Sequence, residues 1–188
     1  MDMLYTKTMF NEEIIENAFK HVCKNRINYS HNNDIWDLRL NWNKEKQQLY
    51  EQLNSGTYRF EPVRKITTES GTLEIWSSRD AVVLKALEII LSDRLRSEIS
   101  VSCCHIKGNG GLKKAVRSVN NNINGFKYVM KTDVRTYYAS IDHDVLFEII
   151  GRLAATIIFN IINTSRRQLT ICHILIIHRT SRRRGGCC

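Results

Sequence analysis

The sequence predicts an α+β fold that is rich in helix and contains a β-hairpin and part of a second sheet. In several segments the apolar residues recur at the spacing that places them on one face of a helix. Two alternating segments, 63–67 and 72–76, flank the turn residues Glu69-Ser70-Gly71, as in a hairpin. The segment 126–130 mixes aromatic and β-branched residues, which is typical of a strand with one buried face.

Residues 1–55 predict a helical N-terminal extension. Asn11-Glu12-Glu13 provides a capping side chain and acids near the positive end of the helix dipole, and cations at Lys24–Arg26 close this first helix. A loop then leads to a second helix over Ile35–Leu53. A short strand is the alternative there, because four apolar residues alternate: Trp36, Leu38, Leu40 and Trp42.

Residues 56–125 predict the hairpin at 63–76 followed by two helices, at 79–98 and 112–124. Ser77-Ser78-Arg79-Asp80 provides the cap of the first of these helices. The second follows a glycine-rich turn, which lets the backbone approach a ligand and presents free N–H groups to phosphate. Most such turns have no ligand, and this one lacks the spacing of a P-loop.

The net charge of +9 indicates a polyanionic partner. Residues 1–150 contain 21 Lys and Arg against 19 Asp and Glu, whereas residues 151–188 contain seven Arg and no acid. Any nucleic-acid binding is therefore expected to depend mostly on the segment 151–188. The abrupt change of composition near residue 151 resembles a change of reading frame, and a basic RNA-binding tail is the alternative.

The six cysteines include two adjacent pairs and no C-x-x-C spacing, which argues against a zinc or redox motif. A ligand set of Cys172, His178 and Cys187 is conceivable but disfavoured. The N-terminus lacks the basic and apolar regions of a signal peptide. The apolar segments 153–162 and 169–177 are too short to span a bilayer. We expect a cytoplasmic protein with reduced thiols and no membrane partner.

The most informative segment is Lys131–His143, with the sequence KTDVRTYYASIDH. Asp133 falls at the C-terminal end of the predicted strand, where open sheets commonly hold their ligands. Asp142 is placed to cap a helix that follows, whose apolar positions recur at helical spacing: Val145, Leu146, Ile149 and Ile150. An isolated Asp at such a place would be only a turn residue, but the surrounding aromatic pair and Ser-Ile-Asp-His make that interpretation weaker.

This segment resembles the first catalytic motif of bacterial retroelement reverse transcriptases, the type found in group II introns and retrons. The resemblance covers roughly residues 20–150, because the hairpin, the Arg79-Asp80 signature and the glycine-rich turn precede the motif in the family's order. It implies the fingers and partial palm of a right-hand polymerase, with fingers at 56–125, the start of the palm at 126–150 and an incomplete palm sheet. Residues 151–188 would then be an aberrant basic tail.

The resemblance also implies roles for individual residues. Asp133 would be a catalytic carboxylate that binds Mg²⁺ together with the backbone carbonyl of Val134. Tyr138 would lie under the sugar of the incoming nucleotide and exclude ribonucleotides, the competing view being that Tyr137 does so. The nucleotide phosphates would be neutralised by Arg64, Lys65 and Arg79. The template would contact Lys107, Gly108, Asn109, Gly110, Gly111, Lys113 and Lys114.

Each of the basic side chains near the hairpin has a structural alternative. Arg64 and Lys65 suit an exposed edge strand that is kept soluble by its charges. Arg79 suits a surface residue beside Asp80. The hairpin also departs from the family pattern, because segment 71–76 lacks the usual Arg-Pro-Leu.

The sequence lacks part of the chemistry that the resemblance implies. It contains no Asp-Asp pair and no acid after Glu148, so the family's Tyr-x-Asp-Asp carboxylates are missing. We therefore expect a reverse-transcriptase fragment that is inactive alone, whose partners would be an RNA template, a DNA primer and deoxynucleoside triphosphates. The alternative is a non-catalytic RNA- or template-binding module. A basic structural protein is a third possibility, but it would mean that four motifs stand in the family's order by coincidence.

Overall fold

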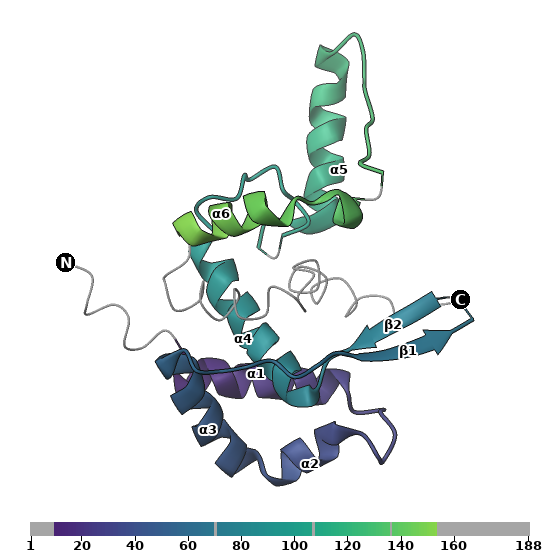
Figure 1. Ribbon diagram of the computed structural model, residues 1–188. Helices are drawn as coiled ribbons and strands as arrows, with labels where there is room; N and C mark the ends of the chain where they lie inside the picture. Colours follow the sequence, from purple (N-terminus) through teal and green to yellow (C-terminus); the bar gives the residue numbers. More distant parts are fainter. Residues whose placement is uncertain (1–9, 70, 107, 136, 154–188) are drawn as a thin grey trace, which may run out of the picture. The chain divides into compact units, whose positions relative to one another are not determined.

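The computed structural model describes residues 10–69, 71–106, 108–135 and 137–153 (Figure 1). These residues form two compact units. The first unit combines the described residues up to Asp93 with those from Asp142 onward, and the second unit is Arg94–Ile141. Helices and one antiparallel two-stranded sheet make up the regular structure of the described residues, which confirms the α+β class.

The first unit contains most of the helices and the hairpin. Its elements are α1 (Glu12–Asn25), α2 (Asp34–Leu40), α3 (Trp42–Ser55), β1 (Arg64–Thr68), β2 (Gly71–Ile75), α4 (Ser78–Arg94, ending at the unit boundary) and α6 (His143–Leu153). The second unit contains α5 (Gly111–Asn122) and two short 3₁₀ turns, η1 (Ile123–Gly125) and η2 (Tyr137–Ser140). The predicted helix 112–124 is confirmed, and the predicted helix 79–98 is confirmed in position but ends at Arg94.

Helix α1 begins and ends where its sequence predicts. The side chain of Asn11 accepts a hydrogen bond from the backbone N–H of Ile14, with a separation of 2.7 Å. At the other end the backbone N–H of Arg26 donates to the carbonyl of Val22. The Ile14 N–H at the start of the helix and the Val22 carbonyl at its end would otherwise be unpaired.

The predicted single helix over Ile35–Leu53 is wrong, because Asn41 divides it into α2 and α3. The side-chain amide of Asn41 bonds the carbonyl and the carboxylate of Asp37 (3.2 and 3.0 Å) and so competes with helix continuation. The alternative strand is also wrong, since Trp36 and Leu38 lie on α2. Helix α3 ends at Gly56, whose left-handed φ of 68° suits a residue without a Cβ.

The predicted hairpin is confirmed and has a regular register. Arg64 lies opposite Ile75 and Lys65 opposite Glu74, and the Lys65 ammonium is 3.4 Å from the Glu74 carboxylate. At the base of the hairpin the Phe60 ring packs edge-on against Tyr58 and Trp76, with centroid separations of 5.2 and 5.8 Å. This aromatic row fixes the hairpin to the first unit.

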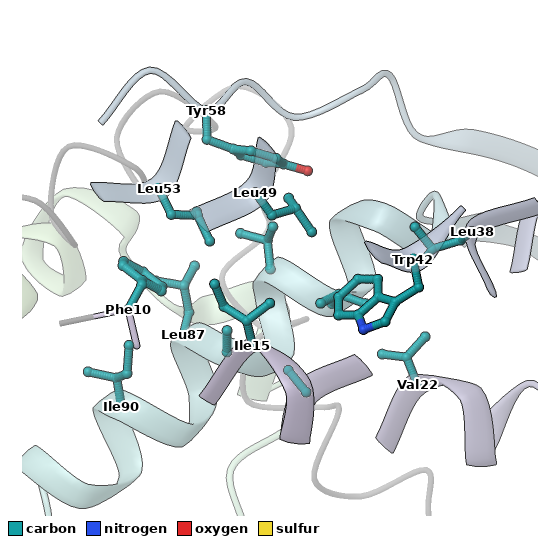
Figure 2. Packing of buried hydrophobic residues seen from close by; sticks show 14 of the residues in the cluster. Phe10, Ile15, Val22, Leu38, Trp42, Leu49, Leu53, Tyr58, Leu87 and Ile90 are labelled. Atoms are coloured by element: carbon teal, nitrogen blue, oxygen red, sulfur yellow. The ribbon is translucent and has the colours of Figure 1, made fainter. Parts of the chain in front are cut away.

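One apolar core holds the first unit together (Figure 2). Ile15 of α1, Leu49 and Leu53 of α3 and Leu87 of α4 are almost fully buried in it. Helix α6 joins the same cluster through Phe147, and the ring of Phe19 stacks on Trp42 at 3.7 Å. The apolar residues of α4 thus serve as packing surface. In α6 the buried side chain is Phe147, whereas Val145 and Ile149 of the predicted stripe are exposed.

The buried polar residues of the described chain gather at the start of α4. They are Arg26, Ser78 and Asp80. The Tyr58 hydroxyl donates to one oxygen of Asp80 at 2.5 Å, and the backbone N–H of Glu61 donates to the other at 3.1 Å. Burial raises the pKa of Asp80 above its ordinary value, although these hydrogen bonds act in the opposite direction.

The strand predicted at 126–130 is wrong, because this segment forms no strand in the structure. Residues 126–135 are exposed and irregular, and β1 with β2 is the only sheet among the described residues. An extended segment becomes a strand only when a neighbour satisfies its backbone groups. No described segment does so here. None of the described helices is long and apolar enough to cross a bilayer.

The raised pKa of Asp80 predicts an unusual pH dependence of stability. A carboxyl group that is harder to ionise when folded stabilises the protein most at pH values below the unfolded pKa, which is about 3.9 for Asp. That contribution is lost as the pH rises through the higher folded pKa. Urea unfolding of the wild type and of Asp80→Asn at pH about 7 and about 4.5 should therefore show the wild type gaining stability relative to the variant in acid. A gap that stays constant or narrows in acid contradicts the assignment.

Candidate nucleic-acid interface

Among the residues that the structure describes, positive charge is concentrated in the second unit. Residues 94–141 carry nine Lys and Arg against two acids, Glu98 and Asp133. Residues 1–93 carry twelve Lys and Arg against fourteen acids. The basic residues of the second unit are Arg94, Arg96, Lys107, Lys113, Lys114, Arg117, Lys127, Lys131 and Arg135.

The described cations of this unit are exposed and lack carboxylate partners. All the ion pairs between described side chains join residues of the first unit. Cations that are not neutralised within the fold attract polyanions, above all the phosphate backbone of nucleic acid. The near-neutral sum over residues 1–150 therefore conceals a basic unit between two acidic stretches.

Helix α5 presents this charge on one side. At 100° per residue, Lys113, Lys114 and Arg117 project opposite to the apolar residues of the helix. Leu112, Val116 and Val119 on the apolar side are themselves exposed, and no residue of α5 is buried. After η1 the chain turns back, as Figure 1 shows.

The glycine-rich turn before α5 requires its glycines. Gly108, Gly110 and Gly111 have φ values of 95°, 87° and 63°, which other residues rarely adopt. Gly110 occupies the N-cap position and offers no side-chain acceptor. The first N–H groups of α5 are therefore left for water or an anion, beside Lys113 and Lys114. This geometry suits the predicted phosphate contact.

Asn109, predicted to contact the template, makes hydrogen bonds within the loop before α5. Its side-chain amide donates to the carbonyls of Ser100 and Cys103 at 3.4 and 3.3 Å. The backbone N–H of Cys103 also donates to the carbonyl of Ser100, at 2.9 Å. Asn109 thus braces the loop that precedes α5. Lys107, predicted to contact the template, lies outside the described residues.

The predicted catalytic motif occupies irregular, exposed chain. Asp133 and Val134 are both exposed. Tyr137 is half exposed and begins the turn η2, whose Ser140 hydroxyl donates to the Tyr137 carbonyl at 2.9 Å. The Tyr138 side chain lies outside what the structure describes, so its role as a sugar contact stays a prediction.

The cap predicted for α6 is confirmed. One carboxylate oxygen of Asp142 accepts from the N–H of Asp144 at 2.9 Å and from that of Val145 at 3.2 Å. Asp142 is therefore committed to the start of the helix.

The Mg²⁺ centre that the resemblance implies stays a prediction. Two-metal phosphoryl transfer needs several carboxylates around both ions. Among the described side chains, no three His, Cys, Asp or Glu residues come together in a group able to hold a metal ion. Asp133 would supply one carboxylate of such a centre.

The basic residues predicted to meet nucleotide phosphates differ in their surroundings. Arg64 is exposed on β1, and Lys65 is exposed beside Glu74. Arg79 is half-buried: its Nε lies 2.9 Å from a Glu45 oxygen, and its guanidinium donates to the side chain of Gln52 at 3.1 Å. It also lies over the ring of Tyr58, 5.5 Å from the centroid. These contacts give Arg79 a structural role, and phosphate binding by all three residues stays a prediction.

Comparison with known proteins adds no relative. No model of a known protein family matches the chain, and no curated protein is significantly similar to it. The resemblance to reverse transcriptases therefore rests on the motif residues alone.

Sequence reasoning missed three exposed cations, Lys127, Lys131 and Arg135. Lys127 lies in the segment interpreted as a half-buried strand, and Lys131 and Arg135 lie in the predicted catalytic motif, so these three charges received no role. Counting charge within segments of about 50 residues, instead of over residues 1–150, would have revealed the basic unit.

The structural role of Arg79 can be measured by a double-mutant cycle with Glu45. Arg79→Ala should lower the free energy of unfolding by about 1 kcal/mol or more, because it removes an ion pair, a hydrogen bond and ring packing. The coupling to Glu45→Ala should be about 0.5–1 kcal/mol in urea unfolding. Strict additivity of the two substitutions would show that the pair stabilises nothing.

Proposed function

We propose that this chain comprises the fingers and the first part of the palm of a reverse-transcriptase-type polymerase, and that by itself it binds nucleic acid without copying it. Support for the polymerase origin is the order of four motifs, which ends in the Asp133 segment. Support for binding is the second unit, with nine cations against two acids and no internal ion pair among its described residues.

The charge of the second unit is the observation that carries the binding proposal. An unpaired exposed cation gains little from its own fold, but it releases counterions when it meets a phosphate. The glycine-rich start of α5 adds backbone N–H groups next to Lys113 and Lys114. The ligand would be RNA or DNA backbone, which is the partner class that a polymerase fragment requires.

Polymerisation by this chain alone is not part of the proposal. The described residues offer Asp133 as a single carboxylate, and the sequence contains no Asp-Asp pair. Nucleotide addition also needs a site closed to water and a positioned primer end. Asp133 is exposed, so it lies in no such site here.

A non-catalytic RNA-binding module is the second candidate, and the same charge distribution favours it. The two candidates differ in the meaning of Asp133. For a polymerase fragment this residue is a remnant of a metal site, whereas for a binding module its negative charge only weakens contact with phosphate.

Primer extension tests the catalytic side of the proposal. With an annealed DNA primer on an RNA template, Mg²⁺ and deoxynucleoside triphosphates, the full chain should add no nucleotide above background. Asp133→Asn serves as the matched control and should behave identically. Extension by the wild type that disappears in Asp133→Asn would overturn the proposal.

The salt dependence of RNA binding tests which unit carries the charge. A variant in which glutamine replaces Lys113, Lys114 and Arg117 should reduce the slope of log affinity against log salt concentration by about 2. Each lost phosphate contact with a single strand removes about 0.7 from that slope. A matched variant with three exposed cations of the first unit changed, Lys20, Lys24 and Lys44, should leave the slope unchanged. Equal reductions in both variants, or none in either, would contradict the assignment to the second unit.

A further inference from the structure

The segment Phe126–Arg135 combines exposed aromatic rings with exposed cations. Phe126 is 69% exposed and Tyr128 is 82% exposed, values far above those of aromatic rings that serve a fold. Lys127, Lys131 and Arg135 recur at every fourth position and are exposed as well. None of the template or nucleotide contacts predicted from the sequence lies at these five residues.

The backbone of this segment is also available. After the N–H of Phe126, which donates to the carbonyl of Ile123 at 3.2 Å, no residue from Lys127 to Arg135 shares a backbone hydrogen bond with another described residue. The backbone N–H and C=O groups of this segment are therefore exposed to solvent and are not paired with the backbone of other described residues.

A cation and a ring lie on the same side of the segment. The ammonium of Lys127 is 5.7 Å from the centroid of the Tyr128 ring, which is within range of a cation–π contact. A base that stacks on Tyr128 would thus bring its phosphate close to a positive charge. Rings beside cations on an exposed groove or strand are the usual means of holding single-stranded nucleic acid.

Charge complementarity selects the occupant. A second copy of the basic unit would bring nine further cations against this one, and residues 151–188 carry seven Arg and no acid. Both would be repelled. A polyanion with exposed planar groups satisfies the cations and the rings together, and duplexes offer only their outermost base faces because their bases are already stacked.

We propose that Phe126–Arg135 is a stacking platform for single-stranded nucleic acid. Tyr128 and Phe126 contact bases, and Lys127, Lys131 and Arg135 contact phosphates. This inference rests on the proposed function for the class of ligand. It adds that the bases themselves are contacted, at a place outside the glycine-rich turn.

The test compares two labelled single strands with the same backbone. One is a uridine oligomer of about twelve nucleotides, and the other is an abasic oligomer of equal length and charge. Fluorescence anisotropy with the full chain should show at least about a tenfold preference for the strand that carries bases, since stacking adds to the electrostatic contact. A uridine–adenine duplex of the same length should bind less tightly than the uridine strand.

Substitutions locate the preference. Tyr128→Leu should abolish most of it while leaving affinity for the abasic strand unchanged, and Tyr128→Phe should retain it. Tyr29→Leu, which changes an exposed tyrosine of the first unit, is the matched control and should have no effect. The exposure of Tyr128 means that its removal leaves the packing of the protein intact, and circular dichroism verifies this.

The outcomes separate this inference from the proposed function. Equal binding of the two strands by the wild type overturns the platform but leaves electrostatic binding in place. A preference that survives in a variant carrying both Phe126→Leu and Tyr128→Leu overturns the assignment to this segment. Failure to bind any of the three oligomers overturns both proposals.

Discussion

The buried polar network at the first turn of α4 is the constraint on which the first unit depends. Arg26, at the end of α1, donates to the Ser78 hydroxyl at 2.6 Å and to the Trp76 carbonyl at 3.0 Å. Asp34, at the start of α2, accepts from the backbone N–H and the hydroxyl of Ser78 at 2.5 and 2.8 Å. On the other side of the turn, the Asp80 carboxylate accepts a hydrogen bond from the Tyr58 hydroxyl. Four chain segments thus meet at one helix end, and the buried residues Arg26, Ser78 and Asp80 each have hydrogen-bond partners there.

This network determines which residues near α4 are free to meet a ligand. Removing one member of a buried hydrogen-bonded pair leaves the other member without a partner. This lowers the stability of the fold by about 1–3 kcal/mol. Arg79 lies within the same turn and is held by Glu45 and Gln52. The positive charge of Arg79 therefore serves the fold even without a ligand. Arg64, the first residue of β1, makes no such contact with the described residues and is exposed.

Local signals in the sequence were sufficient for part of the fold. The caps at Asn11 and Asp142 and the turn around Glu69 act within a few residues, so α1, α6 and the hairpin could be predicted. The division at Asn41 and the network around Asp80 arise from competing or distant partners, which a single sequence does not display. The strand expected at 126–130 failed for the same reason, because strand composition expresses a preference that only a neighbouring strand can realise. For the site, the basic turn before α5 was predictable from residue types, whereas the exposure of Tyr128 was not.

The second unit is organised differently from the first, and this bears on how it binds. Helix α5 buries none of its residues, and Leu112 is 79% exposed, so few packed contacts oppose local opening. Electrostatic contact with phosphates does not require a rigid surface, because screening and counterion release act over about 8–10 Å. Stacking requires only that a ring be exposed. A weakly packed basic unit can therefore bind a flexible strand non-specifically. Positioning a primer and two metal ions demands a packed scaffold, and among the described residues the buried core lies in the first unit.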